Sequence, residues 1–273
     1  MAAAKAKYAR DLTNWEAAAK AAKAAGKTQP KKPQDPVAVR ARRGNVGGLF
    51  KGKIAPLVPY AIRGVIWYQG EANSTPGKAE FYQYQLPLLV QDWRAKWGQD
   101  LPFAWVQLPN FKGAGRDWPT VREAMLKTLA LPKTGMAITV DIGEENDIHP
   151  KNKQEVGRRL ALWALGSVYG QAGPTSGPLP AGSQRNGQSL ELSFTHTDGG
   201  LVAKGGELRG FEIASADGAW KPAHAVIAGN KVIVSSREVA DPTQARYAWT
   251  NFPDCNLYNG AGLPATPFRT AER

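Results

Sequence analysis

The sequence has very little cysteine, little histidine and no long apolar run. Cys255 is the single cysteine in 273 residues, so no disulfide can form within the chain, and the redox compartment stays open. No stretch of about 18 consecutive apolar residues occurs, which argues against a membrane-spanning helix. The first residues, MAAAKAK, lack the apolar segment typical of a signal peptide. With 42% hydrophobic residues, the chain can still form a globular core.

Acidic residues are scarce near the N-terminus, which makes the chain basic. Residues 1–53 contain 13 Lys and Arg against 3 Asp and Glu, a net of +10, whereas the other 220 residues add only +2 to the total of +12. A basic arm can contact nucleic-acid phosphates, but this one lacks the aromatic-plus-basic repeat of a stacking platform. A solvated Lys-rich helix and linker is the simpler interpretation. We therefore expect neither a nucleic-acid nor a membrane partner.

Changes in composition divide the sequence into three parts. Residues 1–43 combine an Ala/Lys-rich helix, stopped at Gly26, with a Pro-rich spacer over 28–36. Residues 44–172 alternate apolar strand-like runs with helical patterns. Residues 173–273 carry short strand-like segments and predict a small β-rich unit.

The middle part predicts an α/β domain with a parallel sheet. Repeated alternation of strands and helices implies right-handed crossovers and a sheet covered on both faces. The strand over 64–67 is expected to be buried on both faces. The expected strands are GVIW (64–67), FAWVQL (103–108) and MAITV (136–140). The expected helices cover 78–97, with a kink or split at Pro87, and begin at Trp118-Pro119 and at Pro150.

The last part predicts an antiparallel β unit after a loop rich in Gly, Pro and Ser over 173–187. Gly229-Asn230 is a two-residue hairpin signal between two of its strands. The expected strands cover 189–194, 210–214, 223–227, 231–235 and 246–249.

Polar residues follow the first and third expected strands, at the edge where open α/β sheets bind ligands. They form the segments YQGEAN (68–73) and DIGEENDIHP (141–150). Plain structural roles are open too, because amides and carboxylates satisfy turns, Asp147 suits the positive end of a helix, and His149 can start one. A metal site from His149, Asp147 and Glu145 lacks a second histidine at ligand spacing, so no metal is expected.

Several blocks resemble the sialate O-acetylesterase family of SGNH-type carbohydrate esterases. IRGVIWYQGEAN (62–73) is similar to a family signature block, and DIHPKNKQ (147–154) with GRRL (157–160) is similar to its histidine block. CNLYN (255–259) and GLP (262–264) are similar to the family's C-terminal region. The resemblance runs from the Ala/Lys-rich helix to the C-terminus. It implies a partial three-layer α/β/α sandwich, hydrolysis of acetyl esters on sugars by a serine hydrolase mechanism, and no cofactor.

The resemblance implies that His149 is the general base, which takes the serine proton and later protonates the leaving sugar hydroxyl. Many SGNH enzymes carry an aspartate three residues before this histidine, where the present sequence has Asn146. Asp147 and Glu71 are therefore the two candidates to hold the imidazole.

The resemblance further implies that Gln69, Gly70 and Asn73 bind the oxyanion or the substrate. Amide side chains can donate hydrogen bonds to a developing oxyanion. The family often has serine after the glutamate of this block, whereas this sequence has Ala72.

The family's nucleophile lies in a Gly-Gln-Ser-Asn block upstream of the Ala/Lys-rich helix, and this sequence begins inside that helix. Asn186-Gly187-Gln188-Ser189 has similar letters but follows the histidine block and leads into a strand. Ser74 lies in a different block, so neither serine is expected to be the nucleophile. We expect a truncated chain, inactive alone, with an apolar sheet edge exposed beside residues 64–67 and poor solubility as a result.

Three functions stay open at this stage. The first is a sugar O-acetylesterase of which this chain is a part. The second is a non-catalytic carbohydrate-binding protein that keeps the same scaffold, and the third is a polyanion-binding protein that uses the basic arm. The acetylated sugar, the oligomeric state and the cellular compartment do not follow from the sequence.

Overall fold

A computed structural model describes residues 2–43, 47–113 and 115–270 of the chain. The chain divides into two compact units, Met1–Tyr60 and Ala61–Arg273. The first expected domain boundary lies between residues 43 and 44. It borders residues 44–46, which lie outside the described residues. The division into three parts therefore stays a prediction.

The first unit is helical. Its elements are α1 (Ala2–Ala24), α2 (Pro36–Arg43) and the short helical turns η1 (Phe50–Ile54) and η2 (Ala55–Leu57). The Pro-rich spacer between α1 and α2 is non-helical, as predicted, because proline cannot continue a helix. The Trp15 indole N–H donates to the Pro30 carbonyl at 2.7 Å and so ties this spacer to α1. None of the helices in the described ranges combines the length and the apolar composition that a membrane span requires.

Within the described residues, the second unit contains a three-stranded parallel sheet in the order β1-β2-β3. The strands are β1 (Val65–Trp67), β2 (Phe103–Val106) and β3 (Thr134–Ala137). Trp105 pairs with Trp67 on one side and with Met136 on the other. The predicted parallel pairing is therefore confirmed, and all three strands end at the same edge of the sheet.

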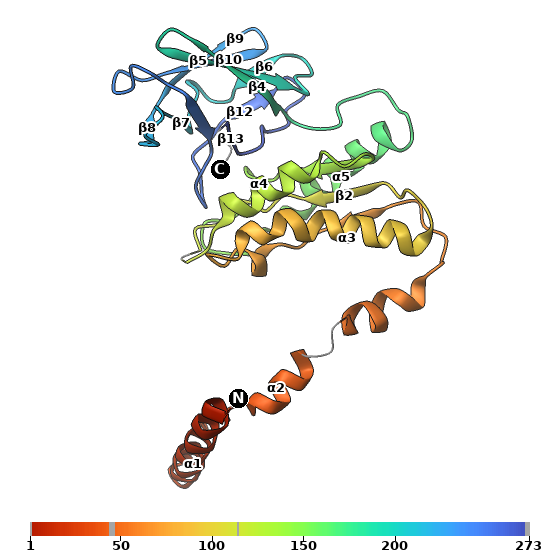
Figure 1. The fold of residues 1–273 in the computed structure, drawn as a ribbon, viewed down its shortest axis with the longest axis vertical. Helices are drawn as coiled ribbons and strands as arrows, with labels where there is room; N and C mark the ends of the chain where they lie inside the picture. The colour runs from red at the N-terminus through yellow and green to blue at the C-terminus, as the bar shows by residue number, and fades with distance from the viewer. Residues whose placement is uncertain (1, 44–46, 114, 271–273) are drawn as a thin grey trace. The chain divides into compact units, whose positions relative to one another are not determined.

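Three helices pack on this sheet (Figure 1): α3 (Tyr82–Trp97), α4 (Trp118–Thr128) and α5 (Lys153–Ser167). Phe103, Trp105 and Met136 point to the face covered by α3 and α4, where they form a buried core with side chains of both helices. Gly135 points to the opposite face, under α5, where a Cβ would lie only 2.0 Å from the Trp163 indole nitrogen. Close approach of α5 therefore requires glycine at this position.

Some predicted helix and strand features were wrong, each for a local reason. The helix expected at Pro150 begins at Lys153, because the Asn152 side chain accepts from the Glu155 N–H at 3.1 Å and caps it. The split expected as one alternative at Pro87 does not occur, since α3 continues through this residue as one helix, preceded by the turn η4 (Ala79–Phe81). The strand over 64–67 is not buried on both faces, since β1 is an edge strand and Ile66 is 68% exposed.

Short antiparallel strands make up the rest of the second unit and lie together at one end of it (Figure 1). They are β4 (Leu179–Asn186), β5 (Ser189–Thr195), β6 (Leu201–Ala203), β7 (Phe211–Ala214), β8 (Lys221–Pro222), β9 (His224–Ala228), β10 (Lys231–Ser235), β11 (Gln244–Tyr247), β12 (Leu257–Asn259) and β13 (Phe268–Arg269). Gly229-Asn230 joins β9 to β10, as predicted. The prediction of a loop over 173–187 was wrong for β4, whose pairing with β5 outweighs its Gly and Pro content.

Arg122 of α4 joins the α/β part to the antiparallel part. Its guanidinium is fully buried and donates to the backbone carbonyls of Leu108 (2.9 Å), Pro109 (2.8 Å), Thr250 (2.8 Å) and Asn251 (3.0 Å). Burial lowers the pKa of Arg122 to about 9, which leaves the side chain charged at pH 7. These carbonyls take the place of the water molecules that the cation loses when it is buried.

We expect Arg122→Lys to lower the free energy of unfolding by about 3 kcal/mol, because an ammonium cannot reach carbonyls on both sides of α4 and leaves buried acceptors unpaired. Urea denaturation measures the loss. Arg185→Lys is the matched control, since Arg185 is 47% exposed, and such surface changes alter stability by less than about 0.5 kcal/mol. Similar losses in the two variants would contradict a special role for Arg122.

The outer edge of β1 gives a second expectation. Among the described residues β1 pairs with β2 alone, so its outer edge is open to association with other chains. Ile66→Lys should therefore raise the fraction of soluble monomer, measured by size-exclusion chromatography with light scattering. Leu88→Lys adds the same charge at a 64% exposed position on α3. An equal gain from Leu88→Lys would attribute the effect to net charge, and a fully monomeric wild-type chain would refute the edge argument.

Candidate functional site

Side-chain amides hold the loop that follows β1. Gln69 Nε2 donates to Asn73 Oδ1 at 2.8 Å, and Asn73 Nδ2 donates to Gln85 Oε1 at 2.7 Å. The Tyr82 hydroxyl donates to the Gln69 carbonyl at 3.0 Å. Burial raises the pKa of Tyr82 to about 12, so the hydroxyl stays a donor at neutral pH. The two amides named as oxyanion or substrate groups are therefore in direct contact.

Gly70 and Glu71 shape the same loop. Gly70 has a φ of 154°, and a Cβ there would lie 2.9 Å from the Met125 methyl group, so both backbone and packing require glycine. Glu71 begins the short helix η3 (Glu71–Asn73), and its backbone carbonyl accepts from the Ser74 hydroxyl at 2.6 Å. Ser74 itself is fully buried.

His149 lies in the loop between β3 and α5. Its side chain is 87% exposed, and Nδ1 lies 3.6 Å from Asp147 Oδ1. The same carboxylate oxygen accepts from the backbone N–H of His149 at 2.9 Å. No hydrogen bond or ion pair links His149 to Glu71 within the described part of the chain. Of the two candidate partners, Asp147 is the one that contacts the imidazole.

The loops after β1 and β3 lie at the same edge of the sheet, because the strands are parallel. Lys153, the first residue of α5, places Nζ 4.9 Å from the centroid of the Tyr68 ring. Tyr68 directly follows β1, and Lys153 follows His149 by four residues. The first selected segment, 68–73, therefore contacts the start of the helix that follows the second, 141–150.

The loop after β2 contributes Asn110, which the sequence analysis missed. Asn110 Oδ1 accepts from the Gly143 N–H at 2.6 Å, and a Cβ on Gly143 would lie 1.9 Å from the Asn110 carbonyl oxygen. Lys112 Nζ also lies 2.6 Å from Glu145 Oε1. Asn110 follows the second expected strand at the same edge, so the rule that selected the other two loops could have found it.

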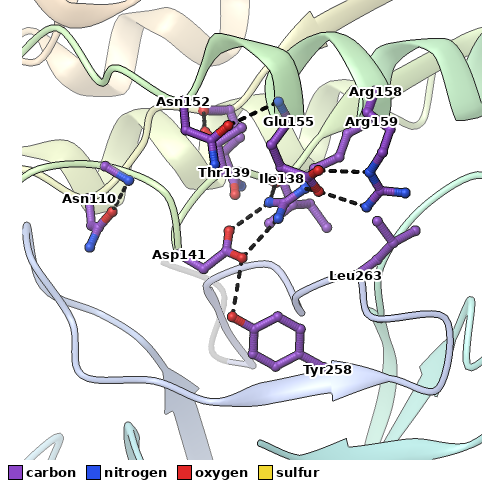
Figure 2. A network of polar contacts seen from close by, with 12 residues as sticks. Asn110, Ile138, Thr139, Asp141, Asn152, Glu155, Arg158, Arg159, Tyr258 and Leu263 are labelled. Atoms are coloured by element: carbon purple, nitrogen blue, oxygen red, sulfur yellow. Dashed lines mark hydrogen bonds and ion pairs between the residues drawn. The ribbon is translucent and has the colours of Figure 1, made fainter.

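A buried charge network holds the start of the His149 loop (Figure 2). The Asp141 carboxylate accepts from Arg159 at 2.6 and 2.8 Å and from the Tyr258 hydroxyl at 3.1 Å. Arg159 also donates to the Ile138 carbonyl and to Glu155 Oε1, at 2.7 Å to the latter. Burial, and then Asp141, raise the pKa of Tyr258, so its hydroxyl stays protonated. Strand β12 thereby braces the loop from the antiparallel part.

The edge of the sheet thus carries an exposed imidazole, a carboxylate beside it and a pair of amides. An imidazole near a carboxylate can accept and return a proton, and amide N–H groups can stabilise a developing negative oxygen. A cavity of about 110 Å³ lies beside Gln69 and Asn73. Among the described residues, no group of three or more His, Cys, Asp or Glu is suited to a metal ion. These groups suit proton transfer next to a carbonyl compound.

The chain is similar to known carbohydrate esterases. A family model described as "Carbohydrate esterase, sialic acid-specific acetylesterase" matches residues 51–165, which include both edge loops, the ones that follow β1 and β3. The sialate O-acetylesterases of Homo sapiens and Mus musculus are 30% and 29% identical over 252 residues, which cover 81% of this chain and 48% and 46% of those proteins. A crystal structure of a carbohydrate acetylesterase from Xanthomonas citri is 45% identical with a TM-score of 0.78, covering 81% of this chain and 53% of that one. The chain therefore spans about half the length of these relatives.

Glu155 makes stability pH-dependent near the site. Hydrogen bonds from Arg158 and then Arg159 lower the pKa of Glu155 to about 2. Since this lies below the ordinary glutamate pKa of 4.5 that applies in the unfolded chain, the carboxylate stabilises the fold above about pH 4.5 and loses that effect as the pH falls toward 2. Between pH 5 and pH 3, we expect Glu155→Gln to lose less unfolding free energy than wild type in urea titrations. Glu207→Gln, at an exposed position, should follow wild type, and a parallel Glu155→Gln profile would contradict the argument.

Proposed function

Because the chain belongs to the sialic acid-specific acetylesterase family of carbohydrate esterases, we propose that its edge loops form part of a site that hydrolyses acetyl esters on sugars. The observation that supports this proposal most directly is the contact between Lys153 and Tyr68, which links the start of α5, four residues after His149, to the loop after β1. The named relatives are esterases of acetylated carbohydrates. The sheet and its helices would then be part of an SGNH-type three-layer sandwich.

In this proposal His149 is the general base. It takes the proton of a serine hydroxyl as the serine oxygen bonds to the acetyl carbonyl carbon, and it returns that proton to the sugar oxygen as the ester bond breaks. It then activates the water that releases acetate from the serine. Its 87% exposure leaves the imidazole accessible to both reactants, and Asp147, whose Oδ1 lies 3.6 Å from Nδ1, is the acid beside it. Glu71 is the alternative acid.

Gln69, Gly70 and Asn73 would stabilise the oxyanion or hold the substrate. The two amides are already oriented, because the Tyr82 hydroxyl donates to Gln69 Oε1 at 3.2 Å and Asn73 donates to Gln85 Oε1 at 2.7 Å, which lowers the cost of reorganisation during the reaction. The small cavity that they line would take the acetyl group.

The nucleophile is the component that we propose to lie outside this sequence. Ser189 stands at the start of β5, in the antiparallel part, and its hydroxyl donates to the Asn186 carbonyl at 2.8 Å. Ser74 is buried, with its hydroxyl donating to Glu71. A further strand along the open edge of β1 would bring a serine to the same edge of the sheet as His149.

Hydrolysis of 4-nitrophenyl acetate tests the position of the nucleophile. The chain should release product no faster than buffer, because removing the serine of a comparable triad enzyme lowers kcat on the order of 10⁶-fold. Turnover by wild type that disappears in His149→Ala, but not in His224→Ala, would place the nucleophile on this chain while keeping His149 as base.

Binding at the edge of the sheet can be tested without turnover. The chain has three histidines, so their ring signals can be assigned by NMR with single substitutions. O-acetylated N-acetylneuraminic acid should shift the His149 signal and leave those of His196 and His224 in place, and Asn73→Ala should weaken the effect. No shift at His149 would refute the site. Equal binding of N-acetylneuraminic acid without the O-acetyl group would instead favour a non-catalytic carbohydrate-binding protein.

A further inference from the structure

A second hollow lies between α3, α4 and β13, and none of the residues assigned to the reaction lines it. Its volume is about 310 Å³, within the range of pockets that bind small molecules. We call it the α3–α4 groove. The side chains that matter here are Gln83, Tyr84, Thr120, Glu123, Lys127 and Arg269.

The floor of the α3–α4 groove is polar and internally neutralised. Arg269 donates to both oxygens of Glu123 at 2.6 Å, and Lys127 Nζ lies 3.5 Å from the same carboxylate. Glu80 adds a second carboxylate to the lining, so two positive and two negative side chains give no net formal charge. A neutral polar ligand suits this balance better than a multiply charged anion.

Tyr84 supplies an aromatic face at the groove. Its side chain is 67% exposed on α3, so the ring is accessible. Gln83 adds an amide that can donate and accept, and Thr120 adds a hydroxyl that can do both. A pyranose ring has an apolar C–H face that packs on an aromatic ring and hydroxyl groups around its rim that need such partners.

Arg269, in the floor of the groove, is held in place by residues outside the groove. The Arg269 guanidinium lies 4.7 Å from the centroid of the Trp249 ring. Arg269 also pairs with Arg246 across β13 and β11, and Arg246 donates to both oxygens of Glu212 at 2.8 and 2.9 Å. A floor that is already ordered loses little conformational freedom when a ligand binds.

Resting on the proposed esterase function, we propose that the α3–α4 groove binds an uncharged pyranose residue of the carbohydrate chain whose acetyl ester is cleaved at the other site. The groove is a separate subsite, because it shares no lining residue with the cavity beside Gln69 and Asn73. It would retain the polymeric or branched part of a substrate and leave the acetylated sugar to the edge of the sheet.

An NMR titration of the full chain with lactose and with xylohexaose tests the groove. Tyr84→Ala should weaken binding of whichever probe binds wild type by about tenfold, the effect expected from losing one stacked aromatic face. Leu88→Ala is the matched control, since Leu88 is 64% exposed one turn further along α3 and does not line the groove. His149→Ala should also bind as wild type does.

Failure of both probes to bind wild type would overturn the groove, as would equal affinities of Tyr84→Ala and Leu88→Ala. Binding that is lost in His149→Ala but kept in Tyr84→Ala would also overturn it, by placing the sugar at the edge of the sheet. The His149 signal with acetylated sialic acid reports on the esterase site alone, so failure of the groove and failure of the proposed function give different results.

Discussion

One buried cation, the Arg122 guanidinium, holds the segment after β2 to the antiparallel part beside the candidate site. It fixes Leu108 and Pro109 at the end of β2 and, on its other side, the carbonyls of Thr250 and Asn251. Asn110 comes next in the chain and accepts from Gly143, at the start of the histidine loop. The segment that carries Asn110 is thus fixed by a charge whose hydrogen-bond partners are all backbone carbonyls.

Residues of the antiparallel part contribute to the structure of the candidate site. The Asn251 backbone carbonyl accepts from the Phe111 N–H at 3.1 Å, and its Oδ1 accepts from the Trp118 N–H at 3.2 Å. Asn251 therefore shapes the segment between β2 and α4. Tyr258 reaches Asp141 from β12 and braces the first residues of the histidine loop (Figure 2). The segment after β2 and the loop after β3 therefore owe part of their geometry to residues more than 100 positions away in the sequence.

Local patterns in the sequence were enough to find the parallel strands, the helix opened by Trp118-Pro119 and the turn at Gly229-Asn230. The strand rule also selected the loops of Gln69 and His149, because parallel strands end together. It could not reveal that Tyr258 approaches Asp141, since nothing near either residue encodes a contact across 117 positions. The pairing of β4 with β5 likewise depends on a partner strand, which outweighs the local signal of Gly and Pro.

The facing arginines of β11 and β13 have a consequence for strand alignment. Two like charges directly opposite each other repel, unless each has its own acid. Glu212 on β7 serves Arg246, and Glu123 on α4 serves Arg269. A shift of β13 along β11 would separate Arg269 from the Glu123 carboxylate while leaving it near the Arg246 guanidinium. The two ion pairs therefore favour one register of β13 on β11 over the neighbouring registers.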